Sequence, residues 1–159
     1  QTVVLDNIKK TGNDNDAGRS IDTTDMYKKE STPELNKELE KTFLMIKEIR
    51  KTAEANKIPL LMVVIPHREQ VDKEKYMEFI NKNNLKESEL DQSKIQKLAL
   101  KFASENKIPA FDMLPYFQQR NKNNTFYFSI DGHWNAKGHE LAADLLYDYL
   151  ANSSLMPIK

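Results

Sequence analysis

The chain has 159 residues, with 24 Lys and Arg against 24 Asp and Glu, three His and no Cys. A domain of this length can bury roughly 70% of its unfolded surface, so it can build a core without disulfides. The absence of cysteine excludes thiolate nucleophiles and thiolate metal sites. A net charge of zero gives no general attraction for nucleic acid or an anionic membrane, and we expect neither as a partner.

The hydropathy of the chain predicts no membrane segment within it. The longest apolar run, Leu60–Ile65, has six residues, whereas about 20 are needed to span a bilayer. The chain begins with Gln1 and runs directly into an apolar stretch, so we expect it to be part of a longer product. The lack of cysteine favours an extracytoplasmic location, and a cytoplasmic one stays open.

The first third of the sequence predicts a strand, a loop and a helix. Thr2–Ile8 is β-branched and apolar, which predicts a short strand. Residues 17–31 are polar and aperiodic, which predicts a long loop. The sequence Ser-Thr-Pro-Glu at 31–34 combines a capping hydroxyl with a proline in the first turn, and apolar residues then recur at helical spacing to about residue 56.

The remainder alternates between strands and helices. The apolar run at 58–65 predicts a strand buried on both faces, and 107–115 repeats its Asn-Lys-Ile-Pro entry. Helical spacing recurs at 68–83 and at 91–106, and in a closing amphipathic helix. We therefore predict one α/β domain over residues 1–159, in which helices cover both faces of a parallel sheet and ligands bind at the carboxyl ends of its strands. Because three strands make a thin sheet, we expect one or two more upstream of Gln1.

The sequence Asp131-Gly132-His133 is the strongest candidate for chemistry. Its glycine permits backbone angles that let both flanking side chains point the same way. The carboxylate can then hold one ring nitrogen and raise the basicity of the other, as a general base requires. The same stretch also fits a helix N-terminus at which Asn135 caps and Trp134 packs. Both interpretations stay open on the residues alone.

A longer match makes the first interpretation specific. Residues 127–139, Tyr-Phe-Ser-Ile-Asp-Gly-His-Trp-Asn-Ala-Lys-Gly-His, resemble the final conserved block of the SGNH/GDSL hydrolase superfamily in its Asp-x-His-Trp-Asn variant. They are similar as well to the acetyltransferase domains that modify alginate. The resemblance covers residues 33–150. It implies a flavodoxin-like three-layer α/β/α fold, and an esterase, lipase or carbohydrate O-acyltransferase that needs no cofactor.

The resemblance also implies roles for individual residues. His133 would act as general base and then as general acid, and Asp131 would orient it. Gly12-Asn13 is similar to the family's Gly-Asn-Asp block, so Asn13 would donate to the oxyanion and Gly12 would allow close backbone approach. A plain Asn/Gly turn is the alternative for this stretch. His67 is a candidate on position alone: it follows the predicted central strand at the ligand edge, so it is expected to line the substrate site, and capping the strand end or facing water is the alternative.

The family's nucleophilic serine is missing from its expected turn. Gly18-Arg19-Ser20 is the nearest sequence, but it follows no predicted strand and comes after the asparagine block. We therefore expect the serine upstream of Gln1, and we expect this chain alone to be inactive. Trp134 is expected to line the substrate site, and His139 to pack or to face solvent.

Three functions stay open. The first is ester chemistry on a small ester or an acylated carbohydrate. The second is a catalytically silent binding or assembly module that keeps the Asp-Gly-His turn for structure. The third is a metal-dependent hydrolase that uses His67, Asp131, His133 and His139, but no close ligand pair supports it, and we predict no metal.

Overall fold

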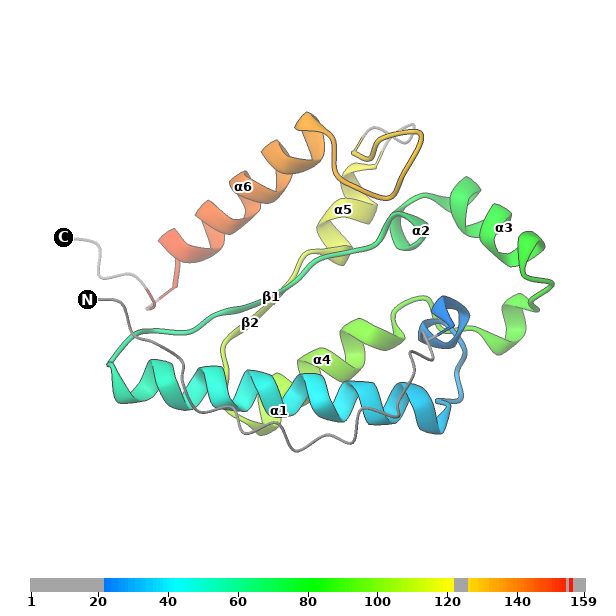
Figure 1. Cartoon of the computed structure of the whole chain (residues 1–159). Coiled ribbons are helices and arrows are strands. Elements are labelled where there is room, and N and C mark those ends of the chain that lie inside the picture. Colours follow the sequence, from blue (N-terminus) through cyan, green and yellow to red (C-terminus); the bar gives the residue numbers. More distant parts are fainter. Residues whose placement is uncertain (1–21, 122–125, 154, 156–159) are drawn as a thin grey trace.

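The computed structural model describes residues 22–121, 126–153 and 155. The predicted strand Thr2–Ile8 lies outside this part. Figure 1 shows two strands running side by side, with α1 and α4 on one side of them and α5 and α6 on the other. The elements are, in chain order, η1 (Thr23–Met26), α1 (Pro33–Ala55), β1 (Met62–Val64), α2 (Arg68–Val71), α3 (Lys73–Lys82), η2 (Glu87–Glu89), α4 (Lys94–Glu105), β2 (Ala110–Asp112), α5 (Leu114–Arg120) and α6 (Ala136–Ala151).

The two strands are parallel and separate two hydrophobic clusters. Met62 pairs with Ala110, and both side chains pack toward α1 and α4, where Phe102 is buried. Val63 pairs with Phe111, and both pack against the cluster formed with α5 and α6. Because neighbouring residues of a strand face opposite sides, this alternation places one helical layer on each face. The predicted α/β fold with three layers is confirmed.

The strand β1 is less buried than its sequence predicts. Its three residues are only half-buried, and Ile65, just beyond them, is 59% exposed. Among the described residues β1 pairs with β2 alone, so one of its edges has no strand beside it. Both faces of β1 are covered as predicted, but its residues are only half-buried because no described strand covers its second edge.

The repeated Asn-Lys-Ile-Pro sequence ends a helix and starts a strand in both places. Lys57 and Lys107 have positive φ angles of 56° and 52°, directly after the caps of α1 and α4. The backbone N–H of Ile58 and of Ile108 each donates to the carbonyl five residues earlier, at 2.9 Å in both cases. These are Schellman closures, which satisfy the last helical carbonyls and turn the chain toward the sheet.

The helix predicted at 68–83 is interrupted at Asp72. This residue is extended, with φ −100° and ψ 108°, and separates α2 from α3. Its buried carboxylate accepts the backbone N–H groups of Glu74 at 2.9 Å and Lys75 at 3.1 Å. Such side-chain capping begins a new helix. Within the described residues, no helix is long and apolar enough to cross a membrane.

Residues 22–31, which we call the entry segment, are the described part of the predicted loop at 17–31. They contain the short 3-10 helix η1, and Tyr27 is buried in a third hydrophobic cluster. Lys94 of α4 is 6% exposed, and its ammonium donates to the carbonyls of Asp25, Lys28 and Glu30 at 3.0, 2.8 and 3.2 Å. A buried ammonium needs such acceptors, so Lys94 fixes the entry segment to α4.

Candidate active site at the carboxyl ends of the strands

The Asp131-Gly132-His133 turn lies in a loop that is attached to the end of β1. Tyr127 forms an isolated antiparallel bridge with Trp134, which closes the loop around the turn. The hydroxyl of Tyr127 donates to the carbonyl of Pro66 at 3.0 Å, and burial raises the pKa of this phenol to about 12. The phenol therefore keeps its proton and holds the loop beside the strand.

The start of α6 fixes the other side of this loop. The side chain of Asn135 accepts the backbone N–H groups of Lys137 at 2.9 Å and Gly138 at 3.1 Å. The predicted cap is confirmed. A Cβ on Gly138 would lie 2.3 Å from the carbonyl oxygen of Phe126, so this close packing accepts only glycine. The turn that precedes Asn135 is thus held at both of its ends.

His133 and Asp131 form a carboxylate–imidazole pair. The imidazole Nδ1 lies 3.3 Å from Asp131 Oδ2, while the backbone N–H of His133 donates to Oδ1 at 2.9 Å. This backbone hydrogen bond, aided by the imidazole, holds the pKa of Asp131 below its ordinary value. The side chains are 85% and 46% exposed, respectively. An ionised carboxylate therefore steers the ring, and Nε2 makes no hydrogen bond to any described residue.

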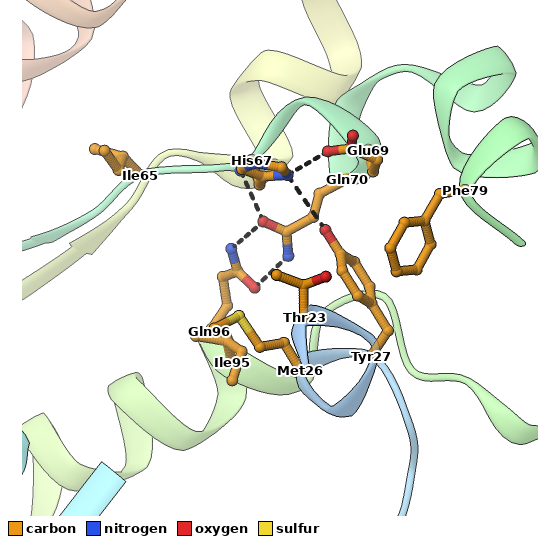
Figure 2. A pocket seen from close by; sticks show the side chains of 10 residues that line it. All are labelled: Thr23, Met26, Tyr27, Ile65, His67, Glu69, Gln70, Phe79, Ile95 and Gln96. Atoms are coloured by element: carbon orange, nitrogen blue, oxygen red, sulfur yellow. Dashed lines mark hydrogen bonds and ion pairs between the residues drawn. The ribbon is translucent and has the colours of Figure 1, made fainter. Parts of the chain in front are cut away.

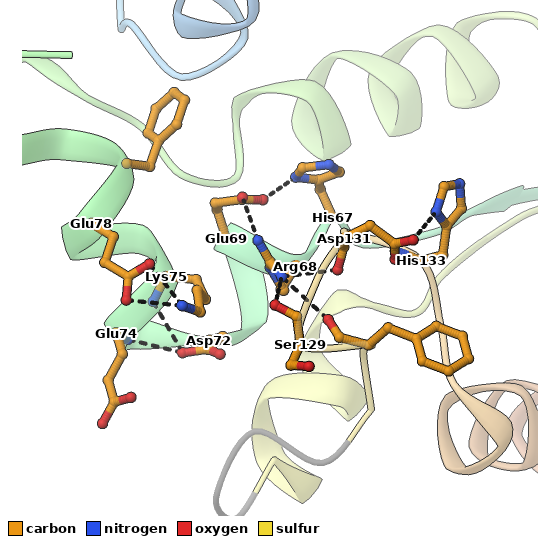
Figure 3. Close-up of polar contacts among 12 residues, drawn as sticks. His67, Arg68, Glu69, Asp72, Glu74, Lys75, Glu78, Ser129, Asp131 and His133 are labelled. Carbon is orange, nitrogen blue, oxygen red and sulfur yellow. Dashed lines mark hydrogen bonds and ion pairs between the residues drawn. The ribbon is translucent and has the colours of Figure 1, made fainter. Parts of the chain in front are cut away.

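Arg68, in the first turn of α2, holds the loop that carries this pair. Its Nη1 donates to the carbonyl of Asp131 at 2.8 Å, and lies 3.3 Å and 3.4 Å from those of Phe128 and Ser129. Figure 3 shows the guanidinium between the loop and Glu69. Because one planar group contacts three successive parts of the loop, Arg68 limits its conformations.

A second carboxylate–imidazole pair lies beside the first. Glu69 forms an ion pair with Nδ1 of His67, and the Tyr27 hydroxyl lies 3.5 Å from the same nitrogen. Burial raises the pKa of Glu69, but the imidazole of His67 and the adjacent backbone and Arg68 outweigh it, so the pKa is lower than usual. The Glu69 side chain is only 14% exposed. An ionised, half-buried acid thus fixes the ring of His67.

Gly132 is where the two pairs meet. A Cβ placed on Gly132 would lie 3.2 Å from Nε2 of His67. His67 therefore lies against the backbone between Asp131 and His133, as Figure 3 also shows. The ring is 61% exposed and His67 is the N-cap residue of α2, so its role as a substrate-lining residue stays a prediction.

The other predicted site residues are placed differently. Trp134 stacks on Phe117 with ring centroids 5.1 Å apart, and belongs to the cluster beneath α6. His139 is exposed and meets the edge of Trp134, as predicted for a packing or surface residue. Gly12, Asn13 and Ser20 lie outside the described residues. In the part of the chain that is described, no three acidic or histidine side chains gather as a metal site would require.

Sequence reasoning missed Arg68 and Glu69. Both appear as ordinary charges at the start of a polar helix, yet they directly follow His67 at the carboxyl end of the central strand. That position is a usable signal, because side chains at the start of a helix after a parallel strand lie at the ligand edge of the sheet.

Comparison with known proteins identifies the family. Residues 24–157 match the SGNH hydrolase-like domain of the acetyltransferase AlgX. The chain belongs to this family. The resemblance seen in residues 127–139 is thereby confirmed. Searches of curated proteins and of solved structures returned no match.

Both carboxylate–imidazole pairs lie within the residues that match this family. In this SGNH hydrolase-like domain, the Asp-x-His turn and the His67–Glu69 pair lie together at the edge where β1 ends. The described residues bring together two imidazoles, each beside a carboxylate. No serine among them makes a hydrogen bond to His133.

Proposed function

We propose that this domain takes part in serine-type ester chemistry, as an esterase or as an O-acyltransferase that acts on a small ester or an acylated carbohydrate. The observation that carries the proposal is the Asp131–His133 pair, with Nδ1 of the ring directed at the carboxylate and Nε2 free of the described residues. The family match supports the class of chemistry.

The proposal gives each ring nitrogen of His133 a task. With Nδ1 held by Asp131, Nε2 takes the proton of a serine hydroxyl while that oxygen attacks the ester carbonyl. The imidazolium then gives the proton to the departing alcohol, leaving an acyl-serine. A water molecule or a sugar hydroxyl attacks this acyl-serine in turn, with His133 again as base. Asp131 stays ionised throughout and stabilises the imidazolium.

Two partners complete the proposed mechanism from outside the described residues. The proposal takes the nucleophilic serine from outside the described residues. Asn13 is proposed to donate to the oxyanion, a contribution of about 3 to 4 kcal/mol where a single such donor has been removed from a hydrolase. Without both partners the described residues supply proton transfer alone.

A catalytically silent binding or assembly module is the second candidate. The observation in its favour is the 85% exposure of the His133 side chain, since a working base is usually shielded from bulk water. In this case Asp131 would serve only to order the turn through the backbone N–H of His133.

Turnover by the full-length protein separates the two. We expect it to release p-nitrophenol from p-nitrophenyl acetate, and His133→Ala to lower kcat/KM by roughly 100- to 10,000-fold. His139→Ala, an exposed histidine a few residues along the chain, is the matched control and should retain the rate. Equal rates for the wild type and His133→Ala would exclude the enzymatic proposal and leave the binding module.

A further inference from the structure

A cavity of about 300 Å³ opens beside His67. It lies between the entry segment, the end of β1, α3 and α4, and Figure 2 shows the side chains that surround it. Most of its surface is apolar, and its polar atoms include those of His67 and Glu69. The apolar side chains are those of Met26, Ile65, Phe79 and Ile95.

One wall of the cavity is rigid because its polar atoms are paired with one another. Gln70 and Gln96 exchange amide hydrogen bonds of 2.6 and 2.9 Å, and both side chains are buried. Gln70 gives its other amide hydrogen to the carbonyl of Gln92 at 2.7 Å, and its carbonyl oxygen also accepts the backbone N–H of His67 at 2.9 Å. Gln70 therefore has no amide hydrogen left for a ligand.

The cavity and the candidate active site share one side chain. His67 lines the cavity, and its Nε2 would be 3.2 Å from a Cβ on Gly132, between Asp131 and His133. The His67 ring therefore contacts both the cavity and the turn that carries the Asp131–His133 pair.

We propose that this cavity is the acyl subsite of the domain, and that it takes an uncharged apolar acyl group larger than acetyl. The proposal rests on the ester chemistry proposed above, and it adds the class of acyl group. His67, fixed by Glu69, stands where the acyl chain meets its ester carbonyl.

The chemistry of the walls selects this occupant. A sugar ring would bring several hydroxyls against Met26, Phe79 and Ile95, where they would lose hydrogen bonds to water without replacement. A ligand carboxylate would meet the ionised side chain of Glu69. A cavity of roughly 150 Å³ lined by aliphatic side chains accepts benzene, so about twice that volume accommodates a short alkyl chain or an aromatic ring.

The test compares acyl chain lengths in the full-length protein. Each methylene that enters an apolar site contributes about 0.8 kcal/mol, which is roughly fourfold in kcat/KM. We expect p-nitrophenyl hexanoate to exceed the acetate in kcat/KM by about tenfold or more. Ile95→Phe, which fills the cavity, should lower the hexanoate-to-acetate ratio at least fivefold. Ile49→Phe places the same change on the exposed face of α1 and should leave the ratio unchanged.

Two further measurements keep the outcome decisive. If Ile95→Phe does not fold, Met26→Phe in the partly exposed η1 fills the cavity from the other side. If no ester is hydrolysed, the proposed function fails, and binding of neutral hexanamide, followed by NMR shifts of His67, tests the cavity separately. A hexanoate-to-acetate ratio unaffected by either filling variant, or no hexanamide binding to the wild type, would overturn the acyl subsite.

Discussion

The chain places side by side two carboxylate–imidazole pairs whose acids differ in burial. Asp131 and His133 are 46% and 85% exposed, and belong to a loop that Arg68 holds from outside. Glu69 and His67 are 14% and 61% exposed, and both line a cavity. The difference teaches that a shared pair of residue types does not define a shared role. We expect the Asp131–His133 pair to exchange a proton with a partner hydroxyl, and Glu69, the more buried of the two acids, to hold the ring of His67.

The largest expected effect separates the pairs by activity. Asp131→Asn should lower kcat/KM of the full-length protein by about 100-fold or more, because the amide can present a donor to Nδ1 and reverse the tautomer. Glu69→Gln should change the rate by less than about tenfold, since it perturbs a positioning group. Steady-state kinetics on p-nitrophenyl acetate measure both. Comparable losses in the two variants would contradict the division of roles.

The second expected effect separates them by stability. Glu69→Gln removes a charge that is paired in a half-buried site, and should lower the free energy of unfolding by about 1 to 2 kcal/mol. Asp131→Asn alters an exposed side chain, and should leave the urea midpoint nearly unchanged. Equilibrium unfolding in urea provides the measurement. A larger loss in Asp131→Asn would show that the turn, not the His67–Glu69 pair, stabilises this edge.

The pH dependence sharpens the same contrast. The pKa of Glu69 is lower in the folded chain than its ordinary value of about 4.3, so the unfolded state binds more protons between these two values. The contribution of Glu69 is therefore complete above about pH 4.3 and is lost as the pH falls through the folded value. The stability difference between wild type and Glu69→Gln should shrink in acid. A difference that stays constant from pH 6 to pH 3 would contradict the ion pair.

The smallest expected effect tests whether the pairs touch. A Cβ on Gly132 would press on Nε2 of His67 at 3.2 Å, and the ring can yield by a few tenths of an ångström. Gly132→Ala should therefore shift the His67 ring signals in NMR spectra and lower stability by less than about 1 kcal/mol. Gly138→Ala, which would meet the Phe126 carbonyl at 2.3 Å, should destabilise far more. Unchanged His67 signals in Gly132→Ala would show that the His67 ring does not contact the turn that carries Asp131 and His133.

The sequence predicted the helices and strands more completely than it predicted the pairing of His67 with Glu69. Helical spacing located α1, α4 and α6 because each has one apolar face, and the repeated Asn-Lys-Ile-Pro sequence marked both strand entries. The sequence did not predict the break between α2 and α3 at Asp72, because a buried aspartate that caps a helix cannot be distinguished in the sequence from an exposed aspartate. Asp131 and His133 were found because they are neighbours in sequence, and the family match supports the turn that contains them.

The contacts across the site could not be predicted in the same way. Arg68 reaches the carbonyl of Asp131 across 63 residues of sequence, and Tyr27 approaches His67 across 40. No local sequence pattern predicts these contacts, because they depend on how α2 and the entry segment pack against the rest of the fold. The same is true of the cavity, whose walls come from four separate segments.

The buried ammonium of Lys94 offers a way to monitor the cavity without a ligand. Acylating reagents modify exposed amines, whereas this one is 6% exposed and engaged with three carbonyls of residues 25–30. It should resist labelling for as long as the entry segment stays docked, while lysines such as Lys51 react at once. The difference between the modification rates of Lys94 and Lys51, measured by mass spectrometry, reports how often the entry segment detaches from α4 beside the proposed acyl subsite.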